Sequence, residues 1–125
     1  MAGDQSPGLK APRIWLKVDF GARGQIGPGK IALLRTIAEH ESISAAAKVM
    51  AMSYRRAWLL IDELNQTVGQ PVVETQVGGS AGGGARLTEH GRRLIDYYEL
   101  LHKHAESGGG DELKALAKML GIAQR

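Results

Sequence analysis

The spacing of apolar residues changes along the chain, and each spacing predicts a different kind of element. From residue 13 to 20 every second residue is apolar, which is the period of a strand with one buried face. From about residue 28 to 40 apolar residues recur every three or four positions, and Pro28 suits a first helical turn. We therefore expect a strand followed by a helix.

Two serines mark the predicted starts of the next helices. Ser44 precedes the short run AAAKVMA, and Ser53 precedes YRRAWLLIDELNQTV. A serine hydroxyl accepts a hydrogen bond from a free N–H group of a first helical turn, so both are predicted N-caps. Gly69 is expected to end the second helix. Trp58 falls on the apolar stripe of that helix, where a core anchor is favoured over a base-stacking platform.

A hairpin and two more helices complete the pattern. PVVETQV is a predicted strand, GGSAGGGA a loop, and ARLT a returning strand. Thr88 can cap a long helix that extends to residue 106. SGGG then predicts a flexible joint, and a short amphipathic helix ends at Gly121.

This order of elements predicts the fold class, mainly α with a small β-hairpin. A three-helix unit followed by a two-stranded hairpin is the layout of a winged helix-turn-helix, in which the second of two closely connected helices can enter a DNA major groove. We expect a disordered arm over residues 1–12 and one winged helix-turn-helix domain, with its N-terminal strand, over 13–106. A flexible joint and a short C-terminal helix are expected over 107–125.

Composition argues against several classes of function. The 125 residues include no cysteine, which excludes disulfides, thiolate metal sites and cysteine nucleophiles. His102 and His104 are two residues apart, so on a helix they cannot form an i, i+4 metal pair. No catalytic grouping is legible, and we expect no enzyme activity and no cofactor. No apolar run reaches the roughly 20 residues of a membrane span, and no signal peptide is evident, so a cytoplasmic protein is expected.

Positive charge is concentrated in the first half of the chain. Residues 1–60 contain nine Lys and Arg against four Asp and Glu, whereas residues 61–125 contain seven against nine. Arg55 and Arg56 stand in the first turn of a predicted helix, where the helix dipole disfavours each cation by a few tenths to about 1 kcal/mol. An external polyanion would offset this cost. In the alternative, both side chains are solvated or pair with carboxylates of the chain itself, such as Asp62.

The motifs that carry a family resemblance follow one another along residues 27–106. They are Ser42-Ile43-Ser44, Met52-Ser53-Tyr54, Ala57-Trp58, Leu87-Thr88 and Gly91. With these motifs the chain resembles the DNA-binding domain of the molybdenum-dependent transcriptional regulators, the ModE family, and more distantly that of the LysR-type regulators. Members of the ModE family also carry molybdate-binding domains, which have no counterpart in this sequence. We therefore expect the DNA-binding half alone, without binding of molybdate.

The resemblance implies sequence-specific binding of duplex DNA in the regulation of transcription. The recognition helix, residues 53–68, is expected in the major groove, and the wing, residues 78–86, at the DNA backbone or in the minor groove. The alternative for the wing is a hairpin tip without contact. The implied DNA-binding residues come from two helices and the wing: Ser44, Lys48, Ser53, Tyr54, Arg55, Arg56, Gly82, Gly83 and Arg86.

The two arginines suit different tasks at a DNA surface. A guanidinium can bind guanine O6 and N7 together, or it can bind a phosphate. Because Arg55 and Arg56 are adjacent on a helix, they point about 100° apart, so that one can contact a base and the other the backbone. Tyr54 could either pack at the turn or touch DNA.

The long helix, residues 88–106, carries more apolar surface than one small domain buries. Tyr97, Leu100 and Leu101 extend beyond its main stripe. We expect a homodimer through this helix, bound to a palindromic DNA site; in the alternative, the first strand and the terminal helix cover the face. The rival interpretation of the whole chain is a winged-helix protein–protein adaptor without DNA binding. Such an adaptor would not need two cations at the start of its recognition helix.

Overall fold

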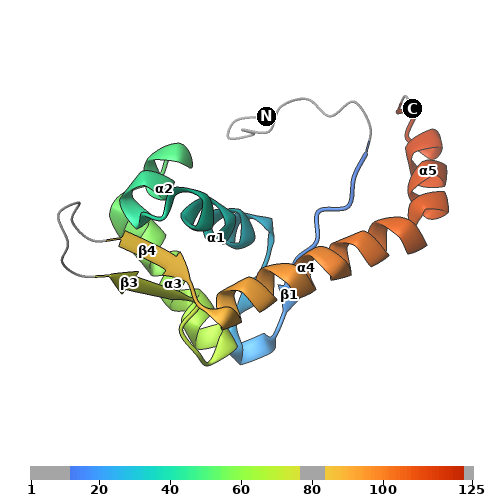
Figure 1. Cartoon of the computed structure of the whole chain (residues 1–125). Coiled ribbons are helices and arrows are strands. Elements are labelled where there is room, and N and C mark those ends of the chain that lie inside the picture. The colour runs from blue at the N-terminus through green and yellow to red at the C-terminus, as the bar shows by residue number, and fades with distance from the viewer. Residues whose placement is uncertain (1–11, 77–83, 123–125) are drawn as a thin grey trace. The chain divides into compact units, whose positions relative to one another are not determined.

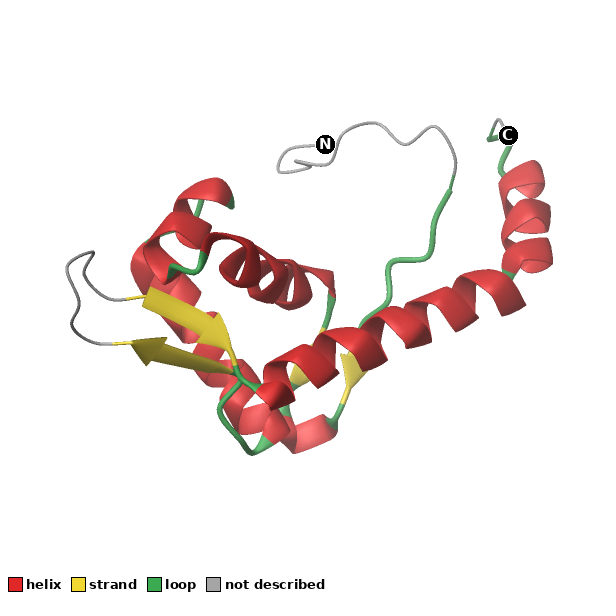
Figure 2. Cartoon of the chain, in the orientation of Figure 1, coloured by secondary structure: helices red, strands yellow, loops and turns green. Residues whose placement is uncertain are grey.

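The computed structural model describes residues 12–76 and 84–122, and helices predominate there over two small pairs of strands (Figures 1 and 2). By contacts, the chain divides into two units, one of Trp15–Glu99 and one of Met1–Ile14 with Leu100–Arg125. The elements follow in this order: β1 (Val18–Asp19), the short 3-10 helix η1 (Gly21–Arg23), β2 (Gln25–Ile26), α1 (Pro28–His40), α2 (Ile43–Val49), α3 (Tyr54–Val68), β3 (Val73–Gln76), β4 (Gly84–Leu87), α4 (Glu89–Gly108) and α5 (Gly110–Met119).

Helix α1 lies at the centre of the core of the Trp15–Glu99 unit. Its side chains Ile31, Leu33, Leu34 and Ile37 are all completely buried. They point to more than one side of the helix because α1 contacts α2, α3 and β4. A helix surrounded in this way needs a broad apolar surface rather than a narrow stripe. The predicted helix over residues 28–40 is therefore confirmed, and its central position explains its composition.

The prediction that Ser44 caps the short helix was wrong. The Ser42 Oγ accepts the hydrogen bond instead, from the Ala45 N–H at 3.1 Å, and α2 begins at Ile43. This earlier start makes Ile43 the first helical residue and leaves its side chain only 5% exposed in the core. Ser44 is exposed in the first turn of α2. Burial of one isoleucine thus decides between two possible caps.

A four-residue turn, 50–53, connects α2 to α3. Ala51 has a left-handed φ of 55°, and the Met52 N–H bonds to the Ala47 carbonyl at 2.9 Å. This is the hydrogen-bond pattern of a Schellman C-cap, which usually has glycine at the left-handed position. Helix α3 then begins as predicted, with the Ser53 Oγ accepting from the Arg56 N–H at 3.0 Å. It ends as predicted at Gly69, whose φ is 83°.

The predicted hairpin is present as the antiparallel pair β3 and β4, with Glu74 opposite Arg86. The loop that joins the two strands, residues 77–83, lies outside the described residues. The predicted contacts of Gly82 and Gly83 lie outside them as well. The hairpin is short, and the buried Val73, Ala85 and Leu87 attach it to the helical core.

The junction between the hairpin and α4 is closely packed. The Thr88 Oγ accepts from the Gly91 N–H at 3.1 Å and donates to the Pro71 carbonyl at 2.7 Å, so the predicted cap is confirmed. Gly91 is buried against the segment before β3. A Cβ at this position would stand 2.2 Å from the Val72 carbonyl oxygen. The close approach therefore requires glycine.

The strand predicted over residues 13–20 is much shorter than expected. Of residues 13–20, only Val18 and Asp19, which form β1, pair with another strand. Val18 lies opposite Ile26 of β2. The alternation of half-buried and exposed residues extends back to residue 13. Before β1, however, the backbone carbonyls are contacted by side chains of α4 and not by a neighbouring strand. Tyr98 donates its hydroxyl to the Leu16 carbonyl. Within the second unit, His102 Nε2 lies 2.8 Å from the Ile14 carbonyl oxygen, and this satisfies another backbone acceptor.

The second unit contains the end of α4 and the whole of α5. Gly109 stands between these helices, and Gly121, with a φ of 73°, ends α5 as predicted. Of α5, only Ala117 is buried. The flexibility expected of residues 107–110, and the domain boundaries proposed from the sequence, stay predictions.

Candidate nucleic-acid interface

The first turn of α3 is an exposed cationic helix end. Tyr54, Arg55 and Arg56 are all exposed there, and the turn contains no acidic residue. Among the described residues, neither guanidinium has an ion pair or a hydrogen bond from its side chain. Pairing with Asp62 is not observed. The two charges therefore face an unfavourable helix dipole without compensation from the described part of the chain.

An aromatic pair, Tyr54 and Trp58, packs together within the first turns of α3. The rings of Tyr54 and Trp58 meet edge to face, with their centroids 6.4 Å apart. Trp58 is half-buried against the hydrophobic core, in agreement with its interpretation as a core anchor. The Tyr54 side chain remains 54% exposed. Tyr54 therefore packs at the turn and still leaves about half of its side chain accessible.

Helix α2 packs against α3 and carries two further predicted contact residues. Ser44 and Lys48 are both exposed, and their spacing of four residues places them on the same face of α2. Lys48 is in the last turn, where the helix dipole favours a cation. Ser53 is exposed as well, although its hydroxyl is occupied as the cap of α3.

Arg86 is not a free cation. Its Nε lies 2.7 Å from Oε1 of Glu74, the residue directly opposite on the neighbouring strand. Both side chains are about half exposed, so the pair is a solvated one that contributes roughly 0–1 kcal/mol. The electrostatic character of the hairpin thus differs from that of α3.

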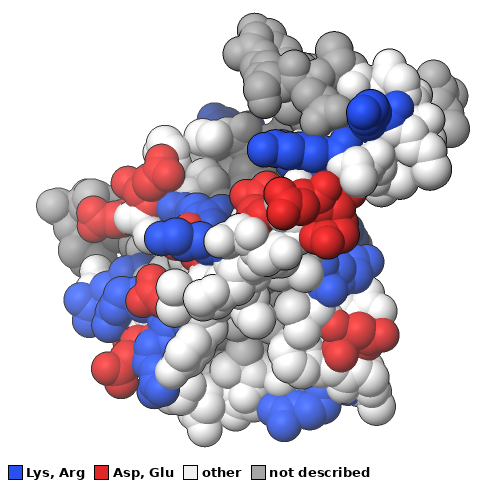
Figure 3. All heavy atoms as spheres, turned by 90° about the vertical axis from the view of Figure 1, so that its right-hand side faces the viewer, with Lys and Arg blue, Asp and Glu red and all other residues white. Residues whose placement is uncertain are grey.

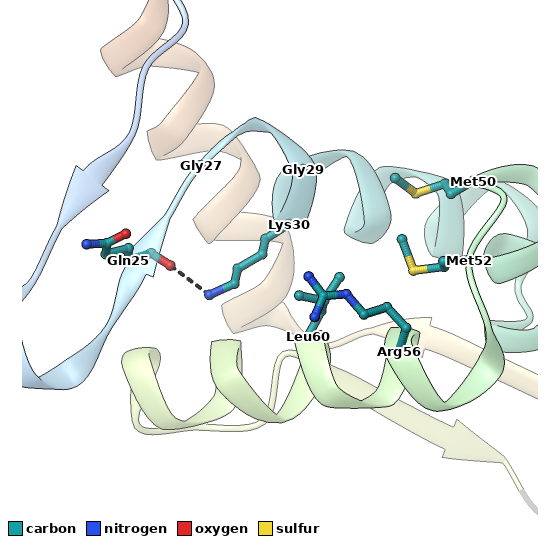
Figure 4. Close-up of a pocket in the computed structure, with 8 residues that line it drawn as sticks. All are labelled: Gln25, Gly27, Gly29, Lys30, Met50, Met52, Arg56 and Leu60. Atoms are coloured by element: carbon teal, nitrogen blue, oxygen red, sulfur yellow. Dashed lines mark hydrogen bonds between the residues drawn. The ribbon is translucent and has the colours of Figure 1, made fainter. Parts of the chain in front are cut away.

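Lys30, in the first turn of α1, was not predicted from the sequence as a site residue. A hollow of about 360 Å³ lies between this turn, the α2–α3 turn and α3. Lys30 and Arg56 both line the hollow, and Figure 4 shows the Arg56 guanidinium extending in front of Leu60 toward the start of α1. The sequence does contain a signal, because Lys30 is a cation in a first helical turn that lacks acidic residues. It is the same anomaly that Arg55 and Arg56 present.

Three features that would indicate other kinds of site are a surface of one charge, a metal site and a membrane-spanning helix. The face drawn in Figure 3 has Lys and Arg interspersed with Asp and Glu, so that face is not a surface of one sign. No group of three His, Asp or Glu residues within 12–76 and 84–122 could hold a metal ion. Over the same ranges, no helix is long and apolar enough to cross a membrane.

Residues 29–92 match the model of the family described as bacterial regulatory helix-turn-helix proteins, lysR family. This match covers nearly all of α1, the whole of α2, α3, β3 and β4, and the start of α4, and it therefore includes the exposed cationic turn of α3. The chain belongs to this family. The resemblance to LysR-type regulators inferred from the motifs is confirmed.

Curated relatives refine this membership. The DNA-binding transcriptional dual regulator ModE of Escherichia coli (strain K12) is 49% identical over 74 residues, which are 59% of this chain and 28% of that protein. The molybdenum-pterin-binding protein MopA of Rhodobacter capsulatus is 38% identical over 100 residues, which are 80% of this chain and 34% of MopA. These matches confirm the similarity to the ModE family. This LysR-family chain spans about a third or less of the length of these two relatives.

A solved structure confirms the fold class. Full-length CbnR, crystallised in complex with its target DNA, superposes with a TM-score of 0.51 at 19% sequence identity, over 67% of this chain and 27% of CbnR. At this identity the likeness shows the fold alone. The predicted winged helix-turn-helix, mainly α with a small hairpin, is the fold of this LysR-family chain.

Proposed function

We propose that this chain binds duplex DNA sequence-specifically and regulates transcription, with α3 in the major groove. One observation carries the proposal: Arg55 and Arg56 are exposed at the start of α3 and have no carboxylate partner among the described residues. Membership of a regulatory helix-turn-helix family supports the same conclusion. Because DNA is a dense polyanion, its approach offsets the cost of holding cations at a helix N-terminus.

The contact residues take different roles in this proposal. Ser53, Tyr54 and the arginines lie at the entering end of α3, close to base edges, while Ser44 and Lys48 on α2 contact the backbone. The wing residues Gly82, Gly83 and Arg86 contact the backbone or the minor groove. Work on chromosomal DNA requires a cytoplasmic location, and no enzyme activity is proposed.

Selection from a random pool of duplexes tests this function directly. The full chain should retain a subset of sequences with a common motif, which then serves as the site for titrations. Arg55→Ala should weaken binding to that motif by about 1–3 kcal/mol while leaving binding to unrelated DNA closer to wild type. Arg23→Ala, in η1 beside the C-terminal end of α3, is the charge-matched control and should bind as wild type does. Retention of no duplex would reject the proposal and favour the adaptor alternative.

The same proposal includes a homodimer through the long helix α4, together with α5. Large apolar side chains are exposed along the two helices and just after them: Tyr97, Leu100, Leu101, Leu116, Met119, Leu120 and Ile122. Two-fold pairing would bury these side chains, and it would set two α3 helices about 34 Å apart on a palindromic site. Light scattering after size exclusion should return twice the chain mass, and Leu101→Lys should lower it toward the monomer. A wild-type monomer at micromolar concentration would exclude the dimer.

A further inference from the structure

The hollow between α1 and α3 brings together two cations from different helices (Figure 4). Lys30 enters from the first turn of α1 and Arg56 from the first turn of α3. None of the residues that line the hollow is acidic. Two like charges facing one cavity repel each other unless an anion lies between them. The arrangement therefore suggests a binding site for an anion.

The ion pair of Lys30 determines the net charge around the hollow. Its Nζ donates to the Gln25 carbonyl at 2.9 Å and lies 3.3 Å from Oε1 of Glu63. Glu63 thus offsets one of the two positive charges, whereas Arg56 has no such partner among the described residues. The balance is one positive charge. It matches a phosphodiester, which carries one negative charge, better than free phosphate, which carries more than one near neutral pH.

The remaining walls suit a backbone phosphate rather than a fully hydrated ion. Met50, Met52 and Leu60 form an apolar side of the hollow, beside the guanidinium of Arg56. Such a wall excludes water and can contact a deoxyribose, and lower polarity strengthens the charge–charge contact. Gly29 also lines the hollow, and a Cβ at this position would meet nothing within 4 Å, so no side chain occupies that part of the wall.

We infer that this hollow holds one phosphate of the DNA backbone, bound by Arg56 and Lys30. The inference rests on the proposed function and divides the work between the two arginines. Arg56 fixes the register of α3 against one strand, and Arg55, which does not line the hollow, contacts the bases. Lys30 thereby becomes a DNA-binding residue outside the recognition helix.

The test uses the duplex selected above, with single phosphates replaced by uncharged methylphosphonates. In wild type, one position should be sensitive, with a loss of about tenfold in affinity for a contact between charged groups. Arg56→Gln should lose a similar factor on unmodified DNA and become insensitive to methylphosphonate at that position. Lys30→Gln should behave in the same way, and Lys30→Arg should restore the sensitivity. Arg55→Gln should keep the sensitivity but lose discrimination between base pairs.

Different failures of this experiment have different meanings. If wild type binds no duplex, the proposed function fails and the inference with it. If wild type binds the duplex but Arg56→Gln keeps the full methylphosphonate sensitivity, the phosphate site is wrong and the proposed function stands. Inorganic phosphate, added at constant ionic strength, separates the two sources of the anion. Inhibition of wild type by millimolar phosphate, absent in Arg56→Gln and without any methylphosphonate-sensitive position in the duplex, would assign the hollow to a free anion and overturn the inference. Far-UV circular dichroism verifies that each variant is folded.

Discussion

Replacement of Gly91 by alanine is the smallest change that should disturb the junction between the hairpin and α4. The added methyl carbon would stand 2.2 Å from the Val72 carbonyl oxygen and 3.1 Å from its carbon. Because ordinary contacts begin near 3.4 Å, α4 and the segment before β3 must separate by roughly 1 Å. That carbonyl also accepts from the Thr88 N–H at 3.0 Å, so the separation loosens a backbone hydrogen bond.

The magnitude follows from three contributions. Overpacking of a tight site costs about 1–3 kcal/mol, and a weakened hydrogen bond adds up to about 1 kcal/mol. The greater helix propensity of alanine returns about 1 kcal/mol. Gly91→Ala should therefore lower the free energy of unfolding by up to about 3 kcal/mol. This loss of stability arises from local packing, so it does not depend on whether the chain binds DNA.

Urea titration followed by far-UV circular dichroism measures this loss as a lower midpoint with an unchanged slope. Gly108→Ala is the matched control, because it lies in the same helix with nothing within 4 Å of the added Cβ. It should leave the midpoint unchanged or raise it by the equivalent of up to about 1 kcal/mol. Equal midpoints for the two variants would refute the argument that close approach requires glycine at position 91.

Two further stability predictions concern the turn before α3 and the contact between α4 and the N-terminal segment. Ala51→Gly should stabilise the chain by roughly 0.5–1 kcal/mol, since relief of a left-handed alanine (about 1–2 kcal/mol) outweighs the flexibility that glycine adds to the unfolded chain; a lower urea midpoint would contradict it. Tyr98→Phe should cost about 1 kcal/mol, because the Leu16 carbonyl loses its donor. Burial raises the pKa of Tyr98, so the unfolded chain loses this proton first. Wild type should therefore lose stability as pH rises above about 10, and Tyr98→Phe should lack this part of the decline.

The sequence pattern predicts an element correctly wherever local geometry and core packing require the same residues. Ser53 and Gly69 mark the ends of α3 by side-chain and backbone geometry that needs no distant partner. Thr88 caps α4 for the same reason. The apolar spacing of α1 and α3 is strong because both helices pack into one core.

The errors arose where a distant contact decides between local alternatives. Ser42 and Ser44 are equally good caps by sequence, and only the burial of Ile43 selects the first. The alternation over residues 13–20 correctly predicts which side chains are exposed as far as residue 19. It does not reveal that Tyr98 supplies the hydrogen bond to Leu16 that a neighbouring strand would give. Lys30 was overlooked because its proximity to Arg56 exists only after α1 and α3 have packed together.

The charge distribution gives the helices and the hairpin different parts in the proposed DNA binding. Arg86 and Glu74 form a neutral pair, so the pair adds little to the long-range attraction of a polyanion. Arg55 and Arg56 lack such partners among the described residues, and Lys48 has an exposed side chain on the neighbouring helix. Phosphate contacts made by unpaired cations release counterions and set the dependence of affinity on salt. On the proposed function, that dependence therefore comes mainly from the helices, and the hairpin contributes only once DNA competes with Glu74 for Arg86 at close range.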